Sequence, residues 1–418
     1  MQGPCWEGIM SDDLLQPHYA EDFHCIASEC EDTCCQGWGV YVDKAAYKKY
    51  RATPALRRAA TEHIELNPGA RDNFKYARMK FTADNRCPFL ASNKLCSIQK
   101  QHGDEFLSKT CARYPRALVR FDGKLQKALY LSCPEAARLV LLSPQLLPPQ
   151  DAPRYHEFPL EQSQNSDSGS SALVRQMRSF ALDLLQDRTY PLWQRLFLLG
   201  TVCRRVHELT AAQQTTQIPQ LLAQYATMIL EGKLRPHLAG IPARPGLQLD
   251  LALKLIQRRY QVDQPHEGFV ACVSDLLQAI SESQESAGPD PATRYHQAYL
   301  RYYDPFDQAY PCFMENYLLN YVFRTGFPFV DITDPVERSI GPLISYLLMA
   351  FHYRLLHSLL IGAAWRHGNA FSIAQAVQLV PTFARGVEHN VKFADELMSF
   401  ASSPELQNSD GLAVLLRN

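Results

Sequence analysis

The sequence lacks any strong excess of charge of one sign. Over 418 residues, 42 Lys and Arg face 43 Asp and Glu, which gives a formal net charge of −1. The first 142 residues, the most basic part, carry only 20 basic against 17 acidic side chains. Chains that bind nucleic acid usually show a clear basic excess. The composition therefore predicts a protein that does not bind nucleic acid.

The first residues also lack the features of a secretory signal. They read MQGPCWEGIMSDDLLQPHYAEDF, with no basic stretch followed by an apolar one. We therefore expect a cytoplasmic protein. In that compartment thiols stay reduced, so a scaffold of disulfides, as in an extracellular domain, is disfavoured.

No long apolar run is free of charge. The longest extends from Leu343 to Trp365 and contains His352, Arg354 and His357 near its middle. Charged side chains at mid-span are costly in a bilayer. The pattern predicts a buried amphipathic helix and no membrane insertion.

Three segments follow from composition. Residues 1–142 hold most cysteines and turn dipeptides, residues 143–171 form a linker rich in Pro, Ser and Gln, and residues 172–418 show apolar side chains at helical spacing. We predict a mainly α fold, with an irregular cysteine-rich N-terminal metal or cluster domain followed by an all-α helical domain. The helical domain is the expected platform for a protein substrate.

The cysteines are concentrated towards the N-terminus, where nine of the twelve lie in the first 133 residues. Eight of these stand at short spacings among turn residues, and thiols that loops bring together are typical metal ligands. The candidate ligands are Cys25, Cys30, Cys34, Cys35, Cys87, Cys96, Cys111 and Cys133. The other cysteines, Cys5, Cys203, Cys272 and Cys312, are interpreted as core or surface residues.

The spacing leaves the metal open. Four thiolates suit zinc and an iron–sulfur cluster equally well. The pattern is not that of two CxxC knuckles, and the adjacent pair Cys34-Cys35 is unusual for one tetrahedral zinc ion. Two sites, or a cluster with one thiol in reserve, are both consistent with the sequence.

These motifs resemble the flagellin lysine-N-methylase family, within a broader group of zinc- or iron-chelating cysteine domains. The resemblance rests on CEDTCCQGWGVYVDKAAYKKY, RCPFL, LCSIQ, LSKTCARYPR and LSCPEAARL. It covers residues 20–140 strongly, with a weaker echo in FMENYLLNYVFRTGFPF at residues 313–329. The broader group shows C-x2-C-x2-CC, whereas this chain has Cys25-x4-Cys30-x3-Cys34-Cys35.

The resemblance implies a bacterial enzyme that methylates lysine ε-amino groups of flagellin. It implies S-adenosylmethionine as methyl donor and a [4Fe-4S] cluster held by some of the eight cysteines named above. The rival hypothesis from another class is a non-enzymatic scaffold that holds Zn²⁺ or iron.

Two signatures of known donor sites are missing. There is no GxGxG turn of a Rossmann-type methyltransferase. The radical-type pattern Cys-x3-Cys-x2-Cys begins at Cys30 and Cys34 but fails at Gly37. A donor would have to bind differently, and one hypothesis is an iron with an open coordination position, held by three thiolates and chelated by the donor's amino-acid part. No residue can be named as the general base.

A few other residues are candidate binding groups. Arg113 and Arg116 are candidates for neutralising a cluster or clamping a carboxylate, with a surface role as the alternative. Trp38 is a weak candidate for an aromatic wall, with Tyr41 and Tyr47, although core packing is the preferred interpretation. The other expectations concern polar residues: Asp43 as the N-cap of a helix at residues 44–52, and Glu29, Glu31 and Asp32 in a solvated loop.

Overall fold

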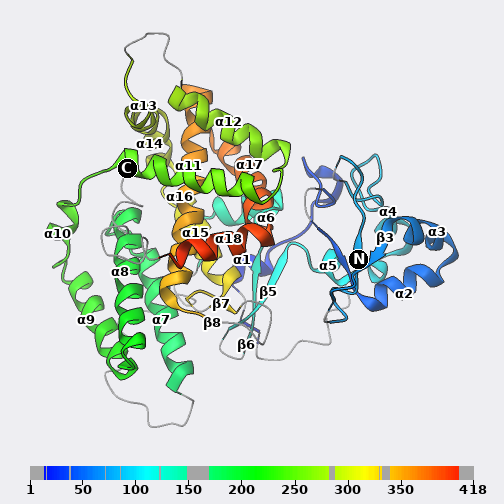
Figure 1. Cartoon of the computed structure of the whole chain (residues 1–418), viewed down its shortest axis with the longest axis horizontal. Helices are drawn as coiled ribbons and strands as arrows, with labels where there is room; N and C mark the ends of the chain where they lie inside the picture. Colours follow the sequence, from blue (N-terminus) through cyan, green and yellow to red (C-terminus); the bar gives the residue numbers. More distant parts are fainter. Residues whose placement is uncertain are drawn as a thin grey trace.

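The computed structural model describes most of the chain. The described residues are 14–15, 17–36, 39–70, 72–84, 86–121, 124–147, 169–281, 288–328, 330–331 and 339–403. They form a large helical body and a smaller N-terminal lobe beside it (Figure 1). The fold is mainly α, as the sequence predicts. Trp38 and Cys5 lie outside the described residues, as does most of the predicted linker.

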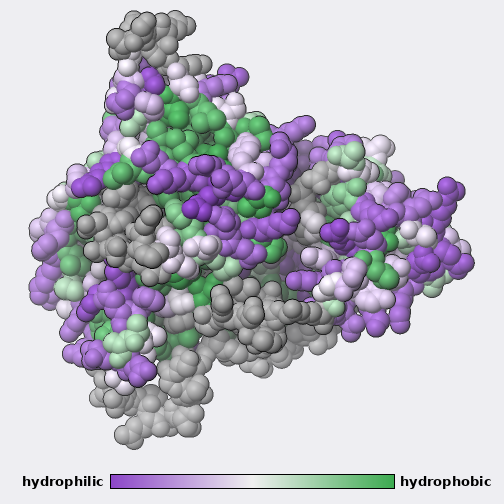
Figure 2. Space-filling model, viewed as in Figure 1, coloured by the Kyte–Doolittle hydropathy of each residue, from purple (hydrophilic) through white to green (hydrophobic). Residues whose placement is uncertain are grey.

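The small lobe is built on two helices and a short sheet. The helices are α2 (Lys44–Ala52) and α3 (Pro54–His63), and the antiparallel sheet has the order β2 (Tyr41–Val42), β4 (Ala77–Met79), β3 (Ile64–Leu66). Two short helices complete the lobe, α4 (Ser97–His102) and α5 (Lys109–Arg113). The apolar side chains of these elements form a separate small core around Tyr50, Ile64 and Phe89. Figure 2 shows mostly hydrophilic residues over this lobe.

A hairpin joins the small lobe to the helical body. Strands β5 (Arg116–Phe121) and β6 (Lys124–Leu129) pair antiparallel, and β1 (Leu14–Leu15) adds to β6 in parallel. Helices α1 (His18–Glu21) and α6 (Pro134–Leu141) flank them. Tyr19, Leu129 and Val140 belong to the large core of the helical body. The segment boundaries at residues 142 and 172 stay predictions.

The helical body follows the apolar periodicity of the sequence closely. Its helices are α7 (Gly169–Gln186), α8 (Leu192–Ala211), α9 (Ile218–Leu230), α10 (Arg235–Ala239), α11 (Pro245–Val262), α12 (Glu267–Ser281), α13 (Pro291–Ala298), α14 (Asp304–Ala309), α15 (Phe313–Thr325), α16 (Pro342–His367), α17 (Ile373–Phe383) and α18 (Val391–Ala401). A two-stranded pair, β7 (Val330–Asp331) and β8 (Ser339–Ile340), is added between α15 and α16.

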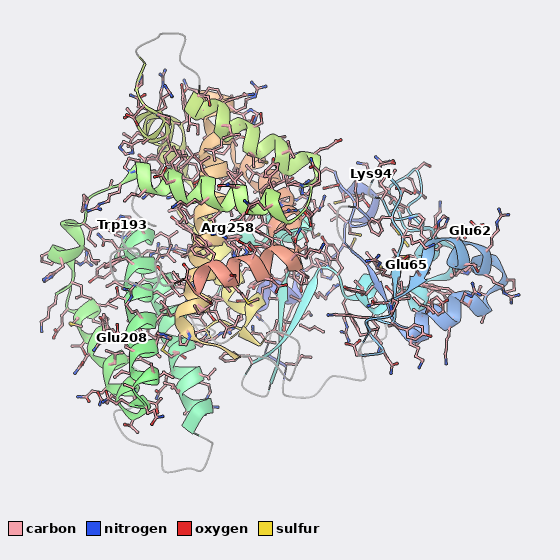
Figure 3. All side chains as sticks on the ribbon, in the orientation of Figure 1. Glu62, Glu65, Lys94, Trp193, Glu208 and Arg258 are labelled. Atoms are coloured by element: carbon pink, nitrogen blue, oxygen red, sulfur yellow. The ribbon has the colours of Figure 1, made fainter. Side chains whose placement is uncertain are left out.

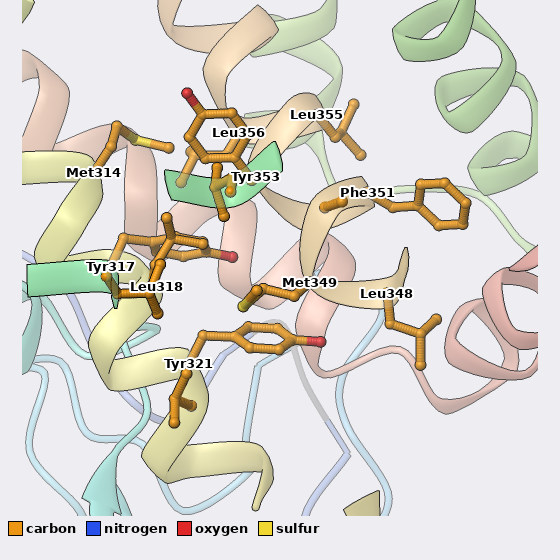
Figure 4. Close-up of a cluster of buried hydrophobic side chains, with 14 of the residues drawn as sticks. Met314, Tyr317, Leu318, Tyr321, Leu348, Met349, Phe351, Tyr353, Leu355 and Leu356 are labelled. Atoms are coloured by element: carbon orange, nitrogen blue, oxygen red, sulfur yellow. The ribbon is translucent and has the colours of Figure 1, made fainter. Parts of the chain in front are cut away.

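Helix α16 is the centre of the large core. It is the one helix among the described residues that is long and apolar enough to cross a membrane, but 94% of its most apolar window is buried inside the protein. Figure 4 shows its residues Leu348 to Leu356 against Met314, Tyr317 and Tyr321 of α15. The prediction of an amphipathic helix is wrong, because neighbouring helices cover α16 on all sides. The prediction that it is buried is confirmed.

Apolar periodicity and Pro or Gly breaks predict a loop over residues 235–246 and helices over residues 292–302 and 372–399. The structure differs at all three places. Residues 235–239, predicted as loop, form α10, since Pro236 occupies a first-turn position that tolerates proline. The helix predicted at residues 292–302 ends as a π-helical segment, Tyr299–Tyr303. The helix predicted at residues 372–399 is interrupted by a second π-helical segment, Ala384–Glu388, between α17 and α18.

Candidate metal centre and adjoining cleft

Five of the predicted thiols gather in the small lobe. A single antiparallel bridge between Gln36 and Arg86 brings two distant segments together, and the Cys87 N–H donates to the Cys35 carbonyl at 2.8 Å. A second bridge, Leu90 to Cys96, closes the loop between Cys87 and Cys96. These backbone bonds place Cys34, Cys35, Cys87 and Cys96 at one end of the small core.

Cys111 joins this group from α5. Ser108 caps this helix, with its hydroxyl accepting from the Cys111 N–H at 3.4 Å. The Lys109 N–H donates to Asp43 Oδ2 at 2.9 Å, while Asp43 Oδ1 accepts from the Ala46 N–H at 3.1 Å. Asp43 therefore caps α2 and ties α5 to it, and the predicted N-cap is confirmed. We call Cys34, Cys35, Cys87, Cys96 and Cys111 the five-thiol group.

The surroundings of Cys34, Cys35 and Cys111 raise the pKa of each of these thiols. A hydrogen bond with Cys35, then burial, raises the pKa of Cys34 strongly. Cys35 lies within hydrogen-bonding reach of both Cys34 and Cys87, and its pKa is also raised. Burial, with Cys96 and Cys34 nearby, raises the pKa of Cys111 to about 12. A bound cation lowers the pKa of such thiols, because it stabilises the thiolate form.

The other three thiols form a second group against the large core. The pKa of Cys133 is raised to about 12, by burial first and then in part by Cys30 and Cys25. Arg116 is influenced electrostatically by Cys25 and Cys133, so its guanidinium lies beside this group. We call Cys25, Cys30 and Cys133 the three-thiol group.

The two groups meet the helical body through ion pairs. Asp32, which precedes the five-thiol group, pairs with Arg385 of the second π-helical segment at 2.5 Å. Glu31 pairs with Arg138 of α6 at 2.6 Å. Arg385 also donates to the Ser132 carbonyl at 2.9 Å. The expectation of a solvated loop is confirmed, since 45% of the Glu31 side chain and 37% of the Asp32 side chain are exposed, although both carboxylates pair with arginines of other elements.

A cleft of about 730 Å³ lies between the small lobe and the helical body. The small lobe supplies Tyr41 and Phe81 and the end of its sheet, and the body supplies the end of α11, the second π-helical segment and the start of α18. Figure 3 labels Glu65, which lines the cleft on the small lobe, and Arg258 on the body. Arg385, which lines the cleft, also acts electrostatically on Cys34, so the cleft adjoins the five-thiol group.

The lining of the cleft is mainly basic. Its cationic side chains are Arg78, Lys80, Arg259, Arg385 and Lys392. Three of them form ion pairs: Arg78 with Glu65, Arg259 with Asp263, and Arg385 with Asp32. Lys80 and Lys392 have no ion-pair partner in the described part of the chain. The cleft is suited to an anionic group.

The predicted binding residues lie in different places. Arg116 lies by the three-thiol group and over the Phe23 ring at 5.1 Å, whereas Arg113 packs over Phe74 at 5.3 Å. Neither lines the cleft. Tyr41 lines the cleft, while Tyr47 packs in the small core against Tyr76. The cleft residues of the body, Arg385 and Lys392, escaped prediction because nothing in their sequence indicates proximity to residues 34–111.

The donor set can be tested against the metals that the sequence predicts. Five thiols in one group suit an iron–sulfur cluster, which needs several thiolates. Across the described ranges, no three His, Cys, Asp or Glu side chains are placed to hold a single metal ion. The chemistry of the donors fits a cluster and zinc alike.

Comparison with known proteins shows to which family the chain belongs. A model of the "FliB lysine N-methylase C-terminal domain" matches residues 178–415, more than half of the chain. The chain belongs to the FliB lysine N-methylase family. It is also 35% identical over 134 residues to the "Lysine-N-methylase" of Salmonella choleraesuis, which covers 31% of this chain and 33% of that protein.

The similarity to the curated relatives is confined to part of each protein. The match to the "Flagellar biosynthetic protein FliU" of Salmonella muenchen is 34% identical and covers 31% of this chain and 78% of that protein. The chain thus spans about a third of the length of the curated lysine-N-methylases that it matches. No solved structure matches the chain.

Proposed function

We propose that the chain is a protein-lysine N-methyltransferase that transfers methyl groups from S-adenosylmethionine to flagellin in the cytoplasm, with a [4Fe-4S] cluster in the five-thiol group. The family supports lysine methylation, and the name of the flagellar relative supports flagellin as the substrate. The observation that carries the proposal is the basic cleft of about 730 Å³ that adjoins the five-thiol group. Its volume lies in the range of small-molecule sites.

Three members of the five-thiol group would hold the cluster and leave one iron with an open position, and its assembly would convert neutral thiols to thiolates. When bound, the cluster would supply an iron that the amino-acid part of the donor can chelate. The three-thiol group has Arg116 beside it. The proposed cluster needs no ligand from the three-thiol group.

The cleft residues have separate tasks in this proposal. Lys80 and Lys392, which have no ion-pair partner in the described chain, attract the donor's carboxylate. The rings of Tyr41 and Phe81 provide faces for the sulfonium through cation–π attraction. The same positive charges disfavour the ammonium form of an incoming lysine, so its pKa falls towards the neutral amine.

The transfer itself is a simple displacement. The lone pair of the neutral lysine amine attacks the methyl carbon, the carbon–nitrogen bond forms, and the carbon–sulfur bond breaks. The sulfonium becomes a neutral thioether, and the proton lost from the lysine ammonium passes to water. The protein contributes orientation and exclusion of solvent.

The test is incubation of anaerobic full-length protein with S-adenosylmethionine and flagellin, read by the intact mass of flagellin. We expect increments of one methyl group. We expect Cys111→Ser to lose iron and to methylate flagellin at least about a hundredfold more slowly. Mutation of a residue that only hydrogen-bonds to a metal ligand already costs 10–100-fold in metal affinity or activity. Lys80→Ala with Lys392→Ala should raise the donor KM about tenfold, which is 1.4 kcal/mol. Cys272→Ser on α12 is the matched control and should change neither the iron content nor the kinetics of methylation.

The outcomes separate the two hypotheses. Brown protein with iron and sulfide that methylates flagellin supports the proposal. Colourless protein that contains zinc and leaves flagellin unchanged favours the non-enzymatic scaffold. An intact cluster with no mass change contradicts the assigned reaction.

A further inference from the structure

Charge is distributed unevenly between the small lobe and the rest of the chain. Residues 39–113, which form most of the small lobe, carry 15 Lys and Arg side chains against 7 Asp and Glu. The rest of the chain carries 27 against 36. None of the described Lys and Arg side chains of residues 39–113 is buried. The hydrophilic surface of this lobe in Figure 2 is therefore mostly cationic, although the whole chain is nearly neutral.

The three-stranded sheet of the small lobe has a cavity at each end. At one end, the start of β2 and the end of β4 line the cleft. At the other end, the residues that end or follow β2 and β3 and those that precede β4 line a cavity of about 440 Å³. We call this cavity the sheet-end pocket, and its lining includes Lys44, Leu66, Asn67, Asp72, Asn73 and Tyr76.

Backbone hydrogen bonds hold the lining of the sheet-end pocket together. The Asn67 N–H donates to the Tyr76 carbonyl at 3.0 Å, which continues the pairing of β3 with β4. The Lys44 N–H donates to the Asn73 carbonyl at 2.9 Å, which ties the start of α2 to the turn before β4. The pocket is therefore part of the folded sheet and not a gap beside a loose loop.

The outer face of the sheet connects the pocket to the cleft. The strand register places Tyr41, Arg78 and Glu65 in one row across the three strands. Arg78 is exposed between buried Ala77 and Met79, so this row lies on the face away from the small core. Strands rise by about 3.3 Å per residue, so the three residues of β4 separate the two cavities by about 10 Å. A peptide of a few residues is long enough to reach both.

The surface between the two cavities carries a positive charge that is not neutralised. Lys44 and Lys75 have no ion-pair partner in the part of the chain that the structure describes, and Lys75 lies over the Tyr41 ring at 5.7 Å. The Asp72 carboxylate in the pocket wall accepts from two backbone N–H groups of its own turn, at 2.7 and 2.8 Å. Leu66 is 53% exposed and gives the pocket an apolar wall. The surface thus offers cations next to an apolar contact.

We propose that the outer face of the sheet and the sheet-end pocket bind an acidic segment of the protein substrate, a few residues from the lysine that enters the cleft. This inference rests on the proposed function for the identity of the partner. Carboxylates of the segment lie near Lys44 and Lys75, and an apolar side chain packs against Leu66. The enzyme therefore prefers lysines with Asp or Glu about three or more residues away.

The charge of the whole chain favours a short acidic segment over nucleic acid. Charges act over about 8–10 Å at physiological salt, so a short segment on the sheet interacts mainly with the cations beside it. A long polyanion extends over the rest of the chain, where acidic side chains outnumber basic ones by 36 to 27. Repulsion there opposes the attraction of the small lobe.

The test is fluorescence anisotropy of the full chain, without methyl donor, with two labelled peptides. Each has one central lysine, flanked on both sides by glutamates in one peptide and by glutamines in the other. We expect the glutamate peptide to bind at least about tenfold more tightly at low salt, and this preference to shrink as salt is added. Lys44→Ala with Lys75→Ala should weaken binding of the glutamate peptide about three- to tenfold, because exposed ion pairs are individually weak. Binding of the glutamine peptide should not change.

Arg58→Ala with Lys100→Ala is the matched control. It removes two exposed cations of the same lobe that line neither cavity, and it should bind both peptides like the wild type. Equal binding of the two peptides by the wild type, or an equal loss in the two double variants, overturns the proposal. Tighter binding of a single-stranded oligonucleotide than of the glutamate peptide also overturns it, in favour of nucleic acid.

The outcomes for docking and for catalysis are separable. A preference for the glutamate peptide in protein that leaves flagellin unmethylated would remove the proposed function and keep the docking surface. Methylation of flagellin by protein that does not distinguish the two peptides would remove the docking surface alone.

Discussion

At the scale of single residues, a buried polar network lies behind the cleft. Glu388 Oε1 accepts from the Tyr317 hydroxyl at 2.7 Å and from Arg324 at 3.0 Å, and only 2% of the Glu388 side chain is exposed. Burial acts to raise the pKa of Glu388, but Arg324, His352 and Tyr317 outweigh it, and the pKa is lowered. The network thus holds a buried charge pair next to His389, which lines the cleft.

His389 should make stability depend on pH. Burial lowers its pKa to about 4, against the opposing influence of Glu388. Between pH about 6.5 and 4 the unfolded chain binds a proton that the folded chain does not, so this part of the stability falls as pH falls. We expect the free energy of unfolding of the wild type, relative to His389→Gln, to decrease steadily from pH 7 to 5.

The measurement is urea unfolding of both proteins over that range. His18→Gln, which replaces a side chain that is 62% exposed, is the matched control. A difference between wild type and His389→Gln that is constant with pH would show that the pKa of His389 is the same in the folded and the unfolded chain.

The sequence predicts residue roles well where a local rule governs them. Asp43 follows from the preference of Asp for N-caps, and the cap is present. The partition of eight cysteines into five and three does not follow from spacing, because it depends on the bridge between Gln36 and Arg86. Likewise, Lys80 and Lys392 approach one cleft only through the packing of two lobes.

At the scale of elements, the contact between α12 and α16 depends on Gly362. A Cβ atom on Gly362 would lie 2.6 Å from the backbone of Leu276. Backbone atoms cannot rotate away as a side chain can, so Gly362→Ala must displace α12. We expect a loss of about 1–3 kcal/mol in the free energy of unfolding, typical of overpacking, measured by chemical denaturation.

Gly246→Ala in α11 provides the comparison, because its Cβ would lie 3.4 Å from that of Ala292, an ordinary contact. It should be neutral or slightly stabilising, since Ala is the better helix former. Equal stability of Gly362→Ala and Gly246→Ala would contradict the close packing of the two helices.

Helix bounds were largely predictable for a simple reason. Apolar periodicity and Pro or Gly breaks predict helices over residues 218–230 and 247–260, and α9 and α11 match these bounds within a few residues. The π-helical segments are not predictable, because one extra residue in a turn leaves no trace in an apolar pattern that continues through it. The second segment carries Arg385, which lines the cleft.

At the scale of the whole molecule, the two cores differ greatly in size. The small core contains twelve buried side chains in the described chain, one of them Cys87, and three further cysteines of the five-thiol group pack against it. The large core surrounds α16 and needs no cysteine group for its closure. Cores this small are marginally stable unless a metal or disulfide supports them.

Removal of the proposed cluster should therefore unfold the small lobe and spare the helical body. Binding energy of a metal centre is folding energy when the site does not exist in the unfolded chain. We expect anaerobic chelation to increase proteolysis within residues 39–111 at least about tenfold. Helical circular dichroism should fall by no more than the share that α2 to α5 contribute, because the other helices pack in the large core.

Cleavage sites read by mass spectrometry locate the change, and restoring the metal should reverse it. Cys111→Ser, purified without chelator, should resemble the chelated wild type, whereas Cys272→Ser should resemble the untreated protein, because Cys272 packs against the large core. If chelation left proteolysis of the small lobe unchanged, its twelve apolar side chains would suffice for stability. The five-thiol group would then have a role in chemistry alone.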